Sequence, residues 1–169
     1  MKKLKILVVV LSVLFLYSCG YNFVGSYSSL PNGIDKVFVE NIKNLTSEPN
    51  LQTYLKTDII NELQLDSRVS VVDKDRAQGL IKVAITNYDV SASSFGNSGF
   101  ASRYRCTITA KVSLLQDGKS IIKDKVLTSY KDFNANNEVN ATEIARNITS
   151  KDVLKDLSVK IKDELFVNF

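Results

Sequence analysis

"SRYRCTITAKVSLL", residues 102–115, is the stretch that decides the fold of this chain. It alternates two sets of side chains. The apolar set is Tyr104, Cys106, Ile108, Ala110, Val112 and Leu114, and the polar set is Arg103, Arg105, Thr107, Thr109, Lys111 and Ser113. Successive side chains of a strand point to opposite faces, so this alternation puts one set on each face. The stretch therefore predicts an antiparallel strand with one face on a core and the other in solvent.

The pair Asp117-Gly118 follows and predicts a hairpin to a second strand over residues 120–131. Two registers are open. A two-residue turn would put Lys123 and Lys125 on the core face, opposite Val112 and Ala110. A three-residue loop with a left-handed Gly118 instead sets three apolar residues, Ile122, Val126 and Tyr130, opposite Leu114, Ala110 and Cys106. We expect the second register, which leaves Asp124 on the core side near Val112 as its cost.

The remaining elements are read from spacing and turn residues. Strands are expected over residues 36–41, 68–73 and 79–93, where β-branched and aromatic residues gather. A helix capped by Ser47 and ending near Leu65 is predicted by an apolar stripe at three- and four-residue spacing: Leu51, Tyr54, Leu55, Ile59 and Leu63. These elements suggest an α+β fold, a two-layer sandwich of two helices on a mostly antiparallel four- or five-stranded sheet.

The second helix is expected over the last part of the chain. Asn140 followed by Glu143 is typical of a capping box. The apolar stripe of this helix changes phase near Ser150, and it comprises Ile144, Ile148, Leu154, Leu157, Ile161 and Leu165.

The composition argues against an enzyme. The chain has no histidine, which excludes histidine general bases, Ser–His or Cys–His nucleophile pairs and imidazole metal sites. Two cysteines cannot assemble a zinc cluster, and no Ser-x-x-Lys pattern marks a convincing dyad. We therefore expect no catalytic residues, no metal and no cofactor.

The N-terminal sequence is typical of a targeting segment. Residues 1–18 carry a basic start, Lys2, Lys3 and Lys5, and then an apolar run too short to span a bilayer, which is typical of a signal peptide. The sequence Leu16-Tyr17-Ser18-Cys19 resembles the bacterial lipobox, which implies N-acyl and S-diacylglycerol groups on Cys19. The alternative is a plain signal peptide with a chance cysteine. We expect a signal peptide over 1–18, a lipid-anchored tether over 19–33 and one domain over 34–169.

The balance of basic and acidic residues limits the classes of partner to be expected. Without residues 1–18 the chain keeps nineteen basic and eighteen acidic residues, so a general attraction to nucleic acid is not expected. Gly20 follows the expected lipid cysteine, where an aspartate would retain a lipoprotein in the inner membrane of enteric bacteria. The expected location is the outer membrane.

With these elements in place, the chain resembles the LptE family of lipopolysaccharide-assembly lipoproteins. The resemblance is carried by an ordered set of short stretches: residues 19–23, Leu30-Pro31, Asn44-Leu45-Thr46, Glu48-Pro49, residues 68–73 and Arg103-Tyr104-Arg105. It implies helices on a mostly antiparallel sheet and no enzymatic activity. It also implies an accessory or plug subunit inside an LptD-type outer-membrane β-barrel, which helps the barrel assemble and binds or hands over lipopolysaccharide. The alternative is an envelope lipoprotein that regulates or scaffolds a periplasmic enzyme without binding lipopolysaccharide.

Some family members bind lipopolysaccharide through basic residues near two loops. The corresponding loops here, at Phe95-Gly96 and residues 137–140, carry no base, so those residues are not transferred. The expected hairpin register instead suggests a cationic, acid-free stripe on the non-core face, able to bind phosphates. Its candidates are Arg103, Arg105, Lys111, Lys123 and Lys125, with Lys131 beside them. The alternative is a solvated face on which lysines only oppose aggregation.

Overall fold

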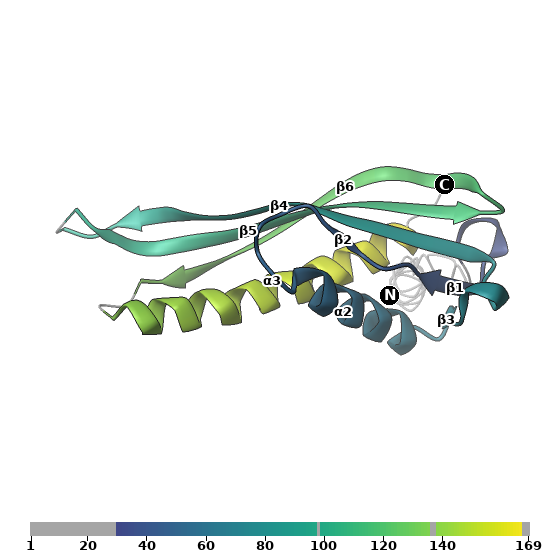
Figure 1. The fold of residues 1–169 in the computed structure, drawn as a ribbon, viewed down its shortest axis with the longest axis horizontal. Helices are drawn as coiled ribbons and strands as arrows, with labels where there is room; N and C mark the ends of the chain where they lie inside the picture. Colours follow the sequence, from purple (N-terminus) through teal and green to yellow (C-terminus); the bar gives the residue numbers. More distant parts are fainter. Residues whose placement is uncertain (1–29, 98, 136–137, 167–169) are drawn as a thin grey trace, which may run out of the picture.

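A computed structural model describes residues 30–97, 99–135 and 138–166 of the chain. It has two layers: a six-stranded sheet and two helices that cover one face of it (Figure 1). No helix among the described residues lies over the other face, which we call the open face. The predicted α+β sandwich is therefore confirmed, although the sheet has six strands and two of them are only two residues long.

Three long antiparallel strands make up most of the sheet. They are β4 (Gly79–Phe95), β5 (Ala101–Gln116) and β6 (Lys119–Asn134). The alternation that predicted β5 is confirmed, because its apolar set from Cys106 onward is fully buried: Cys106, Ile108, Ala110, Val112 and Leu114. β6 forms one edge of the sheet.

The other end of the sheet is parallel, which the sequence did not predict. β1 (Lys36–Val39) pairs in parallel with β3 (Ser70–Val71) and with β4, and β2 (Lys43–Asn44) also pairs in parallel with β4. Parallel neighbours need a crossover connection, and α2 (Leu51–Leu65) lies in it. Gly79 at the start of β4 has a packing reason, since a Cβ there would lie 2.9 Å from the Ile34 side chain.

The β5–β6 hairpin adopts neither expected register along its whole length. Gln116 pairs with Lys119 across a two-residue turn in which Asp117 and Gly118 both have positive φ, 51° and 76°. Such a turn matches the right-handed twist of the strands. Ile122 does pair with Leu114, as expected.

A bulge then changes the register. Asp124 has φ 46°, and its N–H donates to Ser113 Oγ at 2.9 Å. This irregularity carries Asp124 out to solvent, so the expected position near the core was wrong. Beyond it, Val126 pairs with Lys111 and Tyr130 with Thr107, and both are more than half exposed instead of buried.

α2 begins later than predicted. Ser47 lies in the preceding bend and is not the cap, because a turn at Pro49 and a left-handed Asn50 (φ 64°) come first. The buried face of α2 is Leu51, Leu55, Ile59 and Leu63. Tyr54, expected on this stripe, is 42% exposed.

α3 (Val139–Phe166) is one continuous helix of 28 residues. The predicted capping box is wrong: Asn140 lies inside the first turn, and the Glu143 carboxylate accepts a hydrogen bond from Arg146 Nε. The phase change near Ser150 is real. Leu154, Leu157, Ile161 and Leu165 are fully buried, whereas Ile144 and Ile148 are 60% and 57% exposed.

The first described residues pack beside the start of β4, where Ile34 lies against Gly79. Leu30 is buried and pairs with Ile34 around a short 3-10 turn, η1 (Pro31–Gly33), so packing begins within the segment expected to be a tether. The expected signal peptide and the expected lipid attachment at Cys19 lie outside the described residues. Among the residues described, no helix is long and apolar enough to cross a membrane.

Candidate functional site

The open face of the sheet carries three of the predicted basic residues. Arg103, Arg105 and Lys111 alternate along β5 with buried or partly buried side chains, so they project away from the helices. The side chains of Arg103 and Arg105 are 53% and 43% exposed. These two arginines therefore remain reachable from solvent.

An acidic residue lies beside them, and the expectation of an acid-free face was wrong. Asp132 on β6 is the strand partner of Arg105. Its carboxylate accepts two hydrogen bonds from that guanidinium, at 2.7 and 3.2 Å, and Arg103 Nη2 lies 3.9 Å away. The hydrogen bonds from Arg105 lower the pKa of Asp132, so it is charged at neutral pH. The Arg105 guanidinium also lies 4.4 Å from the centre of the Tyr130 ring.

Lys125 and Lys131 are on the other side of β6, contrary to the predicted register. Lys125 pairs with buried Val112, and its Nζ lies 2.9 Å from Glu164 on α3. Lys131 Nζ lies 3.3 Å from Asp156 and 3.9 Å from Asp152 on the same helix. These lysines join the sheet edge to α3, so the stripe is shorter than predicted.

Lys111 lies at a shallow cleft of about 200 Å³ on the open face. Lys43 and Lys82 line it too, together with the acids Glu40 and Asp124. Lys82 Nζ is 4.0 Å from Glu40. The cleft is thus a mixed-charge surface. The side chain of Lys123 is exposed.

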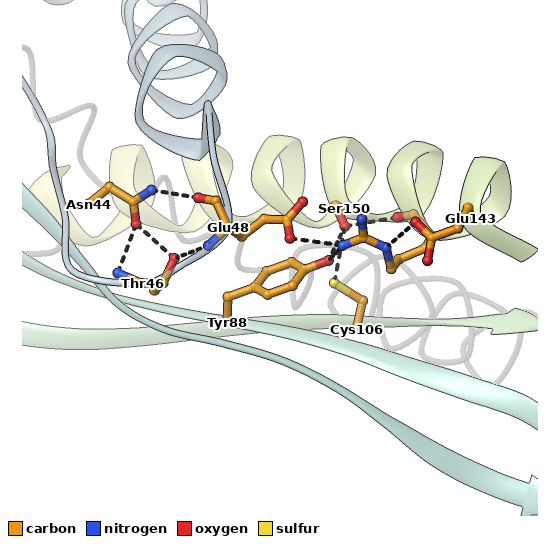
Figure 2. Close-up of polar contacts among 8 residues, drawn as sticks. Asn44, Thr46, Glu48, Tyr88, Cys106, Glu143 and Ser150 are labelled. Carbon is orange, nitrogen blue, oxygen red and sulfur yellow. Dashed lines mark hydrogen bonds and ion pairs between the residues drawn. The ribbon is translucent and has the colours of Figure 1, made fainter.

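A second polar site is a cluster between the two layers, and sequence reasoning did not assemble it (Figure 2). Its first part is a loop built by Asn44. The Asn44 side chain donates to the carbonyl of Glu48 at 2.7 Å and accepts from the N–H and hydroxyl of Thr46 at 3.0 and 2.8 Å. Asn and Thr favour such local bonds to the backbone. This loop fixes the position from which the Glu48 side chain reaches α3.

Arg146 on α3 is the centre of the cluster. Its Nη1 lies 2.9 Å from Glu48 Oε2 and 2.8 Å from Tyr88 Oη, and its Nε lies 3.0 Å from Glu143 Oε2. Burial disfavours the charged guanidinium, but the hydrogen bonds to Glu48, Glu143 and Tyr88 outweigh this and raise the pKa of Arg146. The residue is permanently charged, and its Nε and Nη1 donate to three partners.

The remaining hydrogen bonds close a ring. The Ser150 hydroxyl donates to the Arg146 carbonyl at 2.8 Å, so it must accept from Tyr88 Oη, 3.0 Å away. Tyr88 in turn accepts from Arg146. Cys106 Sγ, 3.6 Å from Ser150 Oγ, completes the contacts. Cys106 is a buried strand residue as expected, and burial raises the pKa of its thiol, which therefore stays protonated.

This cluster, which we call the Arg146 cluster, is structural. It joins the loop before α2, strands β4 and β5, and the first half of α3. Only the stretch from Asn44 to Pro49 was a partial signal for this cluster, and nothing local in the sequence connects that stretch to Tyr88 or Arg146.

Comparison with solved structures supports the fold. The chain is similar to uncharacterized lipoprotein B from Nitrosomonas europaea, with a TM-score of 0.62 and 15% identity over 87% of this chain and 90% of that one. It is also similar to rare lipoprotein B from Shewanella oneidensis, with a TM-score of 0.55 and 13% identity over 77% of this chain and 92% of that one. The hypothetical protein CT253 from Chlamydia trachomatis gives a TM-score of 0.56 and 9% identity, over 78% and 95% of the two chains. These likenesses concern the fold alone.

Among curated proteins, no sequence matches the chain. A family model does match, and it is described as LptE, lipopolysaccharide-assembly. The match covers residues 34–165, which extends from just before β1 almost to the end of α3. The chain therefore belongs to the LptE family of lipopolysaccharide-assembly proteins.

Proposed function

We propose that this protein is a lipid-anchored, non-catalytic subunit of the outer-membrane lipopolysaccharide-assembly apparatus. In this proposal acyl groups on Cys19 hold it in the outer membrane. The folded domain acts as accessory or plug of a large LptD-type β-barrel, helps that barrel assemble, and binds or hands over lipopolysaccharide at the cell surface.

The observation that carries the proposal is the family match over residues 34–165, which includes nearly the whole described domain. The surface is compatible with it. The open face presents Arg103, Arg105, Asp132 and the mixed-charge cleft at Lys111, and a polar surface suits the polar interior of a large barrel.

The first test is co-purification. A tagged copy of the full protein is isolated from detergent-solubilised outer membranes and examined by gel electrophoresis with and without heating. We expect one large partner in constant ratio, whose mobility changes on heating as that of a folded barrel does. A protein recovered alone, or with a periplasmic enzyme, would contradict the barrel partnership and favour a scaffolding role.

The second test concerns the anchor. The intact mass of the same purified protein is measured. We expect the mass of residues 19–169 with one diacylglycerol and one further acyl chain added. A mass without lipid would mean that Cys19 follows a plain signal peptide. A Cys19→Ala variant is the matched control, and it should carry no lipid.

A further inference from the structure

The outer edge of β4, the side away from β5, is only half occupied. β1 and β2 pair along it as far as Ile85, whose carbonyl accepts a hydrogen bond from the Leu45 N–H at 2.9 Å. The chain then leaves this edge, because the loop after Leu45 leads into α2. From Asn87 to Ala92, β4 pairs only with β5 among the described residues. A row of backbone donors and acceptors is therefore open along this half of the edge.

The strand register identifies the open groups. On the occupied half, every second residue turns its backbone groups outward, as Ile85 does. The pairing with β5 skips Thr86, so this alternation shifts by one residue beyond it. The residues that turn their N–H and C=O groups outward are then Tyr88, Val90 and Ala92. These are the positions to which an added strand would bond.

The open half lacks the features that protect the opposite edge of the sheet. On β6, Lys160 Nζ donates to the Thr128 carbonyl at 2.8 Å, and Lys131 pairs with acids on α3. Between Lys82 and Arg103, by contrast, the chain contains no lysine, arginine or proline. Those residue types commonly keep an edge from pairing with another chain. A long edge without them is typical of a site that receives an added strand.

The side chains along the open half suit a strand laid beside it. Tyr88 and Val90 face the helix layer and are only partly buried. Leu45 at one end of the open half and Phe95 at the other are each 67% exposed. The β4–β5 hairpin extends beyond α2, so α2 does not cover this edge (Figure 1). A strand added here would remove apolar surface from water as well as pair the backbone.

Asp89 indicates what kind of strand is received. It is the single charged residue between Lys82 and Arg103, and its exposed carboxylate has no ion pair or hydrogen bond with any described residue. Opposite charges that face each other across two strands stabilise the pairing. A second copy of β4 would bring no such partner, because residues 83–102 contain no basic side chain. The charge therefore favours a segment of another protein.

We propose that an extended segment of the barrel partner pairs with β4 from Asn87 to Ala92 as an added strand, in line with β2, and places a lysine or arginine opposite Asp89. The inference rests on the proposed function, in which the chain of the barrel surrounds this domain. Backbone hydrogen bonds supply the affinity of the contact, and Asp89 fixes its register.

The first test is competition for the barrel in cells. Parent and variant, both full length and differently tagged, are expressed together, and their ratio in the barrel-bound fraction is compared with their ratio in the whole membrane. Val90→Pro removes an outward N–H, which the edge of a sheet tolerates, and it should be depleted from the complex roughly tenfold. Val90→Thr keeps the N–H and the shape, so it should compete like the parent. Ala92→Pro with Ala92→Ser as its control repeats the comparison at an exposed side chain.

The charge is tested in the same assay. Asp89→Lys places a like charge opposite the proposed basic residue and should also be depleted from the complex. Asp75→Lys makes the same change at an exposed residue of η2 (Lys74–Arg76) and should compete like the parent. Circular dichroism and urea unfolding check that every variant is folded.

Photochemical cross-linking tests the register. The photoreactive residue p-benzoylphenylalanine replaces Asn87 in one variant and Ser91 in another, both exposed on the same face of β4. We expect both to cross-link to one segment of the barrel protein, at points roughly four residues apart, because paired strands advance together.

Several results overturn the proposal. These are proline variants that compete like the parent, an Asp89→Lys variant that does so, cross-links scattered over several segments, or cross-links to a second copy of this chain. In each of these cases a barrel that still co-purifies with the parent leaves the proposed function standing. If the parent itself recovers no barrel, the proposed function and this inference both fail.

Discussion

The Arg146 guanidinium lies 2.9 Å from the Glu48 carboxylate, although 98 positions separate the two residues. Their side chains are only 23% and 22% exposed. This ion pair joins the first half of α3 to the loop before α2, at a place where α3 exposes Ile144 and Ile148 and contributes little apolar burial.

Replacing Arg146 should therefore destabilise the protein. Arg146→Met leaves Glu48 and the Tyr88 hydroxyl without their partner, and we expect a loss of roughly 2–3 kcal/mol in the free energy of unfolding, measured in urea. Arg76→Met is the matched control, since its ion pair with Asp73 is exposed, and it should change stability by less than about 0.5 kcal/mol. Equal effects of the two changes would contradict a structural role for the Arg146 cluster.

The bulge at Asp124 gives a second prediction. A branched side chain is strained at positive φ, so Asp124→Val should destabilise the protein by about 1–2 kcal/mol. Asp124→Gly loses the side chain too but tolerates this backbone, and it should be nearly neutral. Urea unfolding measures the stability of both variants. If Asp124→Gly destabilises the protein as much as Asp124→Val does, the left-handed backbone at this bulge is not what disfavours valine.

The edge of β6 gives a third prediction. Lys160 Nζ donates to the Thr128 carbonyl on this strand at 2.8 Å, and Asp152 and Asp156 pair with Lys131. Together they cover an edge that could otherwise pair with another chain. The double change Asp152→Ala and Asp156→Ala should cost about 1 kcal/mol or less but promote self-association, seen by analytical ultracentrifugation.

The control for this experiment is Asp73→Ala with Asp75→Ala, which makes the same charge change at η2 (Lys74–Arg76), away from the edge. This variant should stay monomeric. If both pairs of changes cause association, net charge and not edge protection is responsible.

Asp58 gives a pH prediction. Burial raises the pKa of this carboxyl above its usual value, in spite of the attraction of Lys155. The folded state thus holds the proton more tightly than the unfolded state, so ionisation of Asp58 lowers stability as pH rises through the acidic range. Asp58→Asn should be more stable than the parent at pH 7, and the difference should vanish below the pKa of the unfolded carboxyl, about 3.9. Thermal unfolding at several pH values measures it.

The arginines beside Asp132 yield a prediction that depends on the proposed function. If they bind the phosphates of lipopolysaccharide, Arg103→Gln with Arg105→Gln should weaken binding roughly a hundredfold, since each charged contact is worth about 1.5 kcal/mol. Asp132→Asn should strengthen it, because Arg105 is then freed from its hydrogen bonds. A structural role alone would not produce opposite signs. Binding to immobilised lipopolysaccharide measures both, and Arg76→Gln on η2 is the control for loss of charge.

Local patterns predicted the long strands and both helices. The alternation from Tyr104 to Leu114 and the stripe from Leu51 to Leu63 depend only on neighbours in the sequence. The parallel pairing of β1 was not predicted, since Val37 meets Gly79 42 positions away and nothing in "KVFVEN" indicates the direction of its partner.

The candidate basic residues likewise divide into those that a local pattern could place and those that it could not. Arg103, Arg105 and Lys111 could be placed on one face because they alternate with buried residues along a regular strand. Lys125 could not, because the bulge at Asp124 shifts everything after it, and an aspartate at positive φ has no local signature. Asp132 was missed for the same reason.

The pairing of β1 also sets an order of events when the chain folds. The β4–β5–β6 meander joins neighbours in the sequence, so its contacts close short loops, whereas β1 must wait for β3 and β4 to form. As the chain emerges N-terminus first, residues 36–44 stay without strand partners until residues 70–85 have followed. In a pulsed hydrogen-exchange experiment the amides of β5 should gain protection first, and those of β1 and β2 should be among the last.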